Sequence, residues 1–482
     1  TVFTFTVPDD LGSGADRNAL SYIQIKYPRQ LEMNGSGTMK FTAGDGALSK
    51  AYFNFNGFSA PGSDSCVVFD NTNHRMILTT RSGTNVQFLV PNSSSEKELY
   101  ITSENQIIQI AKLPPVNPDL LNFAKFIDYS APQYDDVDYI IISHSALASN
   151  VNQYAAYRQS TGYNVLVANI DLLYSEFGYG ISKHPLAMRN FIKYGLTEFA
   201  DTIRGLFLIG KTYKPGDSPY NYRTNPTYNS LTYVPSYGIP PSDIMLTSGI
   251  LDTLYQPAIP TGRLAARSSA EVGWYLEKMQ DFEAAQNAPY NPSDPYEKVW
   301  MKKVLHFAGG SSYSESLMLL NFLNHYKDTL EGPYFGGTVS TFTKTSTAPI
   351  QQNTSDSLKD LINNGVSILN FFGHAAGIGF DISIDNPSEY SNYQKYPFLI
   401  ANSCFAGDLY EPTYSSSEAF VLIENKGMIG YLGSITKSYA SYLNTYSEEL
   451  ISQIARKSYN EPIGLAIQRT IAEIQQACIL LL

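Results

Sequence analysis

Apolar and polar residues alternate along the first part of the chain, up to about residue 115. The alternation has a period of two at 22–27, 51–56 and 85–90, and clusters rich in Gly, Ser, Asn and Pro separate these runs. A period of two is typical of a strand with one buried face. Short strands joined by Gly-rich turns predict a smaller all-β domain, a sandwich or a barrel, over residues 1–115.

A proline-rich stretch ends this pattern at residues 113–118. Proline restricts its own backbone and that of the residue before it, so such a stretch is stiff and extended. We therefore expect a linker over residues 116–135, between the β domain and the rest of the chain.

From about residue 136 the pattern changes to short, continuous apolar runs with helical stretches between them. A continuous apolar run is typical of a parallel strand that helices cover on both faces. Strands are predicted in this way at 139–142, 163–167, 205–210, 303–307, 366–371, 397–401 and 428–432, and helices at 152–159, 185–199 and 269–285. Alternating strands and helices predict the α/β class, with parallel sheets in two tandem subdomains, 136–290 and 291–482.

The charge balance narrows the classes of partner. The chain has 33 Lys and Arg against 44 Asp and Glu, a formal net charge of −11. This excess of acidic groups disfavours a nucleic-acid-binding protein, because phosphate backbones select basic surfaces. The three cysteines are too few and too scattered for a disulfide framework or a Cys-rich zinc site, which leaves room for one free, reactive thiol. No apolar stretch approaches the ~20 residues that cross a bilayer, and the abrupt apolar end at 478–482 suggests a longer protein.

Two of the strongest predicted strands lead directly into reactive side chains. His374 follows the strand at 366–371, and Cys404 follows the strand at 397–401. Loops at the carboxyl ends of strands form the sites of open α/β sheets, so neighbouring strands would bring imidazole and thiol together. The histidine can then accept the thiol proton, and the backbone amides of Ala375 and Cys404 can bind a developing oxyanion. The chemistry would be acyl transfer from a peptide carbonyl to sulfur. The alternative is a small core cysteine and a turn histidine that share no function.

The sequence around these two residues resembles the His and Cys motifs of the gingipain-type cysteine peptidases, at 370–374 and 400–408. Further matching segments extend the resemblance over residues 136–482; they are 174–178, 187–193, 242–243, 260–264, 417–420 and 426–434. The resemblance implies a caspase- and gingipain-like fold. It also implies a cysteine endopeptidase with Cys404 as the nucleophile and His374 as the general base and then the acid.

Within this family, the β domain with its segment 22–29 points to the surface peptidases of the type IX secretion system. That branch implies an exported protein at the bacterial cell surface, associated with the outer membrane. Its substrates would be the C-terminal signal domains of secreted cargo, and other outer-membrane components of the secretion system would be its partners. A sortase-like transfer of cargo from Cys404 to an amine of anionic lipopolysaccharide is implied as well.

Two positions depart from the family pattern. Ala375 follows His374 where the family commonly has glycine, and residues 256–260 contain no acidic residue where gingipains place one before a Gly-Arg pair. The third group that would orient His374 therefore stays open, although a Cys–His dyad can work without it. Two alternatives remain beside the signal peptidase. One is a catalytically silent binding scaffold with the peptidase fold, and the other is a degradative protease without transfer activity.

Other residues near the motifs have two interpretations each. Phe380 and Asp381 line the substrate pocket or belong to a solvated loop, and Asp243 lines the pocket or makes a turn, which we favour. Structural calcium on Asp381, Asp385 and Glu389 is the alternative to no metal, but their spacing does not match a calcium-binding loop. The other histidines lack metal-ligand spacing, and no Gly-rich dinucleotide fingerprint follows a predicted strand, so no cofactor is predicted.

Overall fold

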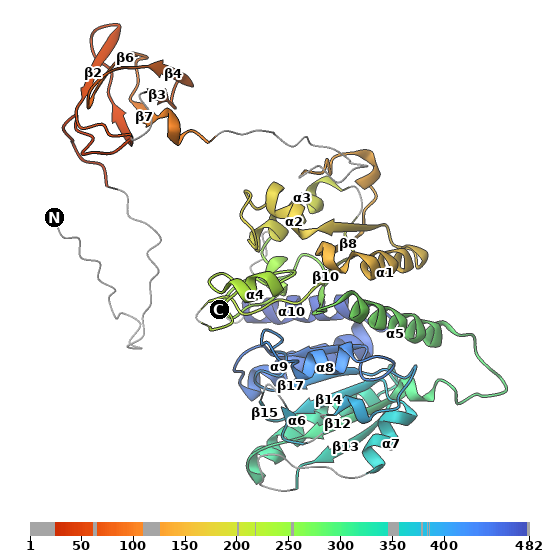
Figure 1. Cartoon of the computed structure of the whole chain (residues 1–482). Coiled ribbons are helices and arrows are strands. Elements are labelled where there is room, and N and C mark those ends of the chain that lie inside the picture. The colour runs from red at the N-terminus through yellow and green to blue at the C-terminus, as the bar shows by residue number, and fades with distance from the viewer. Residues whose placement is uncertain are drawn as a thin grey trace. The chain divides into compact units, whose positions relative to one another are not determined.

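The structure is a computed structural model of the chain, and it divides into two compact units, Thr1–Leu113 and Pro114–Leu482 (Figure 1). It describes residues 25–60, 65–108, 126–199, 202–216, 218–251, 255–345, 356–376, 379–382, 384 and 386–479. Each unit is described by itself.

The N-terminal unit is a sandwich of two antiparallel sheets. One sheet has the order β1 (Thr38–Ala43), β7 (Lys97–Ser103), β3 (Cys66–Asp70) and β4 (Arg75–Leu78), and the other has the order β2 (Lys50–Phe55), β6 (Asn85–Pro91) and β5 (Thr80–Ser82). Inward-facing residues of both sheets form one core, including Phe55, Val86 and Ile101. The all-β prediction for this region is confirmed, since alternation placed one face of each strand toward that core.

The strand expected at 22–27 is not formed in its described part. Ile25 and Tyr27 lie outside any strand, and their side chains are exposed. Residues 22–24 lie outside the described residues. Alternation alone does not make a strand when no neighbouring strand offers hydrogen bonds.

The C-terminal unit contains two parallel sheets. The first has the order β11 (Thr261–Leu264), β10 (Gly205–Ile209), β8 (Tyr139–Ser143) and β9 (Val165–Asn169). Helices α1 (Ala148–Ser160) and α5 (Ser269–Asn287) cover one face of this sheet. Helices α2 (Ile170–Glu176) and α3 (Leu186–Glu198) cover the other face, and α4 (Pro226–Leu231) lies between β10 and β11 in the chain.

The second sheet has the order β13 (Thr338–Thr343), β12 (Lys303–Ala308), β14 (Ile368–Phe372), β17 (Phe398–Asn402) and β18 (Gly430–Gly433). Helices α6 (Tyr313–Glu331) and α9 (Ala440–Ser452) cover one face, and α7 (Asp356–Asn364) and α8 (Ser416–Leu422) cover the other. A short hairpin, β15 (Ala375–Ala376) and β16 (Gly379–Phe380), follows β14. Because β13 and β14 lie on opposite sides of β12, the strand order reverses between β12 and β14, where open α/β sheets form their ligand crevices.

The last helix, α10 (Ile463–Ile479), packs against α9 and also contacts the segment before β11, where Gln468 Nε2 donates to the Pro257 carbonyl at 2.8 Å. Short helical turns complete the described chain; they are Glu104–Gln106, Pro132–Tyr134, Ser145–Leu147, Ile244–Leu246, Val299–Lys302, Pro387–Glu389 and the π-helix Gln453–Lys457. Within the described ranges, no helix combines the length and the apolar character that crossing a bilayer requires. The predicted α/β class with parallel sheets is confirmed.

Candidate active site

Cys404 and His374 leave neighbouring strands at the same edge of the second sheet. Strands β14 and β17 are parallel and in register, with Phe372 opposite Asn402, and each reactive residue lies two positions beyond its strand. The register continues past the strands, because the Gly373 amide donates to the Asn402 carbonyl at 3.2 Å. Parallel neighbours lie about 4.8 Å apart, so the two residues follow strand ends that are direct neighbours. His374 is 56 % exposed and Cys404 is partly buried, which leaves the pair accessible.

The carboxylate of Glu315, from the helix that follows β12, contacts the imidazole of His374. Glu315 lies in the first turn of α6, after β12, and its Oε1 is 3.0 Å from His374 Nε2. Ser312 caps the helix by accepting the Glu315 amide, while Glu315 Oε2 accepts the amide and the hydroxyl of Ser311 at 2.7 and 2.5 Å. Burial opposes ionisation of this carboxyl, but the Ser311 hydrogen bonds and the imidazole outweigh it and lower its pKa to about 2. The carboxylate is therefore ionised and fixed beside the histidine.

Glu315 is a carboxylate in contact with His374, where the sequence left the orienting group open. A carboxylate on Nε2 favours the tautomer with its proton there, which leaves Nδ1 without a proton. A signal for it exists in the sequence: Ser312 and Glu315 have helix-capping spacing directly after the strand at 303–307. That spacing predicts a helix cap. Glu315 contacts His374 because β12 and β14 are neighbouring strands in the folded sheet.

The thiol is held by the loop that follows β18. The Ser438 amide donates to Cys404 Sγ at 3.3 Å, and the Ser438 carbonyl lies 3.5 Å from the same sulfur. The segment after the cysteine runs along this loop, because the Phe405 amide donates to Thr436 O and the Gly407 amide to Ser434 O. An amide aimed at sulfur stabilises a thiolate. Sequence reasoning missed Ser438, since nothing in its pattern indicates a contact 34 positions away.

The two predicted oxyanion donors are placed by the same strand ends. The Asp381 amide donates to the His374 carbonyl at 2.9 Å, so the next pair of the hairpin, Ala375 opposite Phe380, falls at a non-hydrogen-bonded position. The Ala375 amide therefore points out of the hairpin ladder. The Cys404 amide makes no hydrogen bond to any residue that the structure describes. Both amides are available to an oxyanion in this arrangement.

The three residues proposed to line a substrate pocket are engaged elsewhere. Phe380 is buried in the core and packs on Phe371 with ring centroids 4.4 Å apart. Asp381 is buried next to Lys344, so it does not belong to a solvated loop. Asp243 makes two bonds of 2.6 and 2.8 Å to the buried Arg263 and is fixed at a turn.

Two of the three residues of the calcium alternative, Asp381 and Glu389, lie among the described residues. Asp385 lies outside the described residues, and Glu389 pairs with Lys359 and Asn386 on the surface. Across the described ranges, no group of three or more His, Cys, Asp or Glu side chains could hold a metal ion.

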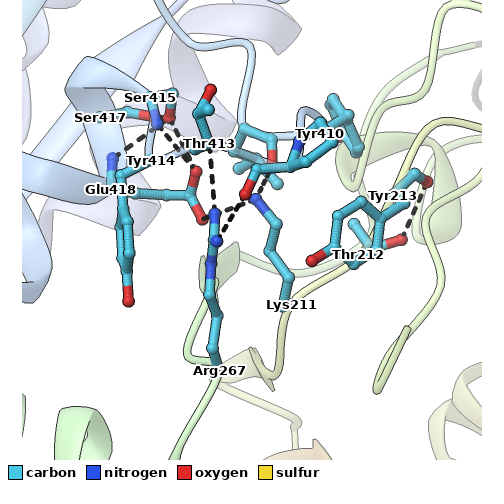
Figure 2. Close-up of polar contacts among 12 residues, drawn as sticks. Lys211, Thr212, Tyr213, Arg267, Tyr410, Thr413, Tyr414, Ser415, Ser417 and Glu418 are labelled. Atoms are coloured by element: carbon cyan, nitrogen blue, oxygen red, sulfur yellow. Dashed lines mark hydrogen bonds and ion pairs between the residues drawn. The ribbon is translucent and has the colours of Figure 1, made fainter. Parts of the chain in front are cut away.

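A buried ion cluster joins the segment after Cys404 to the first sheet (Figure 2). Lys211 follows β10, Arg267 follows β11, and both bind Glu418 Oε1, at 2.6 and 3.0 Å. Glu418 also completes a capping box with Ser415 at the start of α8. Lys211 and Glu418 are each 1 % exposed. Burial lowers the pKa of Lys211 to about 8 although the Glu418 charge opposes that change.

The same two cations hold the backbone between Cys404 and α8. Lys211 donates to the Leu409 carbonyl, and Arg267 donates to the carbonyls of Pro412 and Thr413 at 2.7 and 3.2 Å (Figure 2). The carboxyl ends of both sheets therefore meet at the segment that carries the cysteine.

A thiol and an imidazole that follow neighbouring strands, with a carboxylate on the imidazole, are residue types that cysteine peptidases use. The family model for "Peptidase family C25" matches residues 133–479, and the chain belongs to this family of gingipain-like cysteine peptidases. A search of the curated proteins finds no match.

Solved structures of gingipains share the fold. The crystal structure of the Arg-specific cysteine proteinase gingipain R is similar with a TM-score of 0.52 and 15 % identity, over 70 % of this chain and 72 % of that one. The complex of the Porphyromonas gingivalis RgpB pro- and mature domains is similar with a TM-score of 0.51 and 14 % identity, over 69 % and 72 %. At these identities the likeness concerns the fold alone.

Proposed function

We propose that this chain is an active cysteine endopeptidase in which Cys404 is the nucleophile and His374 is the general base. One observation carries the proposal: these two residues leave in-register neighbouring strands, and Glu315 lies 3.0 Å from the imidazole. Family membership supports peptidase activity independently of this geometry.

The residues divide the reaction into two acyl transfers. His374 takes the thiol proton, Cys404 Sγ attacks the peptide carbonyl, and the amides of Ala375 and Cys404 bind the oxyanion. When the carbon–nitrogen bond breaks, His374 gives its proton to the leaving amine. Water or a second amine then attacks the thioester, His374 takes its proton, and Cys404 leaves as the thiolate that is reprotonated. Glu315 stays ionised throughout and orients the imidazole.

The experiment uses a library of fluorogenic peptides with each residue type before the scissile bond, together with iodoacetamide. Hydrolysis is expected for the wild type and not for Cys404→Ala. Alkylation of Cys404, followed by mass spectrometry, is expected to slow in His374→Ala, while the buried Cys66 serves as an internal control. No hydrolysis, with alkylation that does not depend on His374, would favour the catalytically silent scaffold.

We propose further that the substrates are C-terminal signal domains of type IX secretion cargo, as for PorU-type peptidases at the cell surface. The N-terminal β unit in front of a C25 unit supports this branch of the family. The acyl-enzyme would pass the cargo to an amine of anionic lipopolysaccharide, with other outer-membrane secretion components as partners. Incubating cargo with and without an amine acceptor separates the outcomes: a conjugate supports transfer, and a hydrolysed product alone supports a degradative or signal-removing protease.

A further inference from the structure

The carboxylate of Asp381 lies between the chain segments that follow β12 and β14, next to Gly309 and Gly373. The residue is 4 % exposed and takes no part in the reaction steps above. The strand order of the second sheet reverses between these two strands. The two segments lead to Glu315 and to His374.

Asp381 ties those two loops together. Its Oδ2 accepts the Gly310 amide at 2.8 Å, five residues before Glu315 in the loop from β12. Its own amide donates to the His374 carbonyl at 2.9 Å. One residue thereby fixes the backbone on both sides of the contact between His374 and Glu315.

The surrounding chain is built around this carboxylate. A Cβ added to Gly309 would lie 2.2 Å from Asp381 Oδ1, and a Cβ added to Gly373 would lie 2.6 Å from it. Both loops therefore have glycine where they pass Asp381, since any side chain would displace the carboxylate. Lys344, from the end of β13, lies 3.6 Å from Oδ2 and is 2 % exposed, so the charge is balanced inside the protein.

The arrangement is costly as a purely structural device. Asp381 Oδ1 has no hydrogen-bond partner in the part of the chain that the structure describes, and buried charges are expensive to desolvate. Replacing a buried ion pair with apolar residues often leaves a protein as stable or more stable. The feature that remains to be explained is the acceptor that Asp381 offers to the Gly310 amide.

We propose that Asp381 is a positioning residue that sets the His374–Glu315 geometry. The inference rests on the proposed function, because it concerns the base of the same reaction. Misplacing a reacting group by about 1 Å can cost about 10²-fold in rate. Loss of the Asp381 tie is therefore expected to lower kcat by about 10²-fold with little change in KM, since the substrate does not touch this carboxylate.

The test compares two double variants that both remove the buried charges. Asp381→Asn with Lys344→Met keeps an oxygen that can accept the Gly310 amide, and Asp381→Leu with Lys344→Met does not. The Asn variant is expected to retain most of the wild-type kcat on the fluorogenic peptides, and the Leu variant is expected to lose about 10²-fold. Equal kcat values for the two folded variants would overturn the proposal.

The matched control is Asp138→Asn, and Asp138 lies directly before β8 in the first sheet. Asp138 is also a buried carboxylate with one backbone amide, Asn164 at 2.8 Å, and one cation, Arg204 at 3.1 Å. The kcat of Asp138→Asn is expected to stay at the wild-type value. If it falls as far as that of the Leu variant, the effect at Asp381 is one of general stability and not of positioning.

Alkylation with iodoacetamide distinguishes a wrong role for Asp381 from a wrong proposed function. If alkylation of Cys404 is unchanged in His374→Ala, the proposed pair itself is wrong. If alkylation slows in His374→Ala while the Leu variant matches the wild type in both alkylation and kcat, only the role of Asp381 is wrong.

Discussion

Replacing Glu315 with glutamine tests how strongly the carboxylate acts on His374. Glutamine keeps the length of the side chain and an oxygen for Ser311, but it removes the charge 3.0 Å from the imidazole. In a catalytic triad, a buried carboxylate that fixes the tautomer of the histidine can raise kcat about 10⁴-fold. The structure allows the effect to be estimated here.

The carboxyl pKa is lowered from 4.5 to about 2, although burial by itself would raise it. At about 1.4 kcal/mol for each pKa unit, the ionised form is favoured by about 3 kcal/mol. Three partners share this stabilisation: the Ser311 amide, the Ser311 hydroxyl and His374. The imidazole's share is about 1 kcal/mol or less, because His374 is half exposed and solvent screens the pair. We therefore expect Glu315→Gln to lower kcat about fivefold.

The assay measures kcat and KM on the fluorogenic peptides, with Glu283→Gln as the control. Glu283 is likewise paired, with Arg158 at 2.6 Å and Tyr157 at 2.7 Å, but it belongs to the first sheet's helices. An unchanged kcat in Glu315→Gln, or a loss of about 10³-fold or more, would refute the estimate. The larger loss would mean that the carboxylate selects the tautomer as a buried triad member does.

The same carboxyl makes a prediction about pH. Its pKa is lower in the folded than in the unfolded protein, so its stabilisation is present above pH 4.5 and is lost as pH falls through about 2. The difference in unfolding free energy between the wild type and Glu315→Gln should shrink as pH falls from about 4.5 to about 2, as checked by urea unfolding. A difference that does not change over that range would contradict the assigned contacts.

Three further predictions concern buried groups around the site. Burial lowers the pKa of Lys278 to about 7, so the unfolded chain holds a proton that the folded chain releases, and the unfolding free energy should rise with pH from about 7 to 10.5. In urea unfolding, Lys278→Met should have a smaller rise than the wild type, because Lys211, whose pKa burial also lowers, still contributes to it. An unaltered pH dependence would refute the assignment. Glu418→Gln leaves Lys211 and Arg267 without their buried partner and should lower the unfolding free energy by about 3–5 kcal/mol. Urea unfolding measures this loss, with the exposed Glu424→Gln as the control. Equal losses in the two variants would contradict the prediction. Gly373→Ala places a Cβ 2.6 Å from Asp381 Oδ1 and should abolish peptide hydrolysis. In the control Gly44→Ala, the new Cβ meets no atom within 4 Å, and hydrolysis should stay intact. Full activity of Gly373→Ala would contradict the packing.

Continuous apolar runs made most of the parallel strands predictable. β8, β10, β12, β14 and β17 are buried on both faces, so nearly every position is apolar and the pattern is unmistakable. β13 was not predicted because it is an edge strand, with the polar sequence Thr-Val-Ser-Thr-Phe-Thr and several half-exposed positions. Helices α9 and α10 were not predicted either.

The residues at the strand ends were predictable for the same reason, whereas their partners were not. His374 and Cys404 follow strong strands, so the chain itself indicates where they emerge. Glu315 contacts His374 only because β12 and β14 are neighbours, and strand order is a property of the folded sheet. Asp381 could not be placed by its position after the histidine, since its burial depends on glycines 8 and 72 positions away.

The two sheets of the C-terminal unit make one site because the first sheet holds the chain that leaves the second. Lys211 and Arg267 stand at the carboxyl ends of β10 and β11, and they bind Glu418 and three carbonyls of the segment after Cys404. Ion pairs this deeply buried are weak evidence for stability, because desolvation offsets most of their attraction. Their directional bonds specify a single backbone path for residues 405–418, and an apolar contact of the same area would permit several. The chain is thus held at Cys404 by Ser438 and, between Leu409 and Glu418, by the two cations that follow strands of the first sheet.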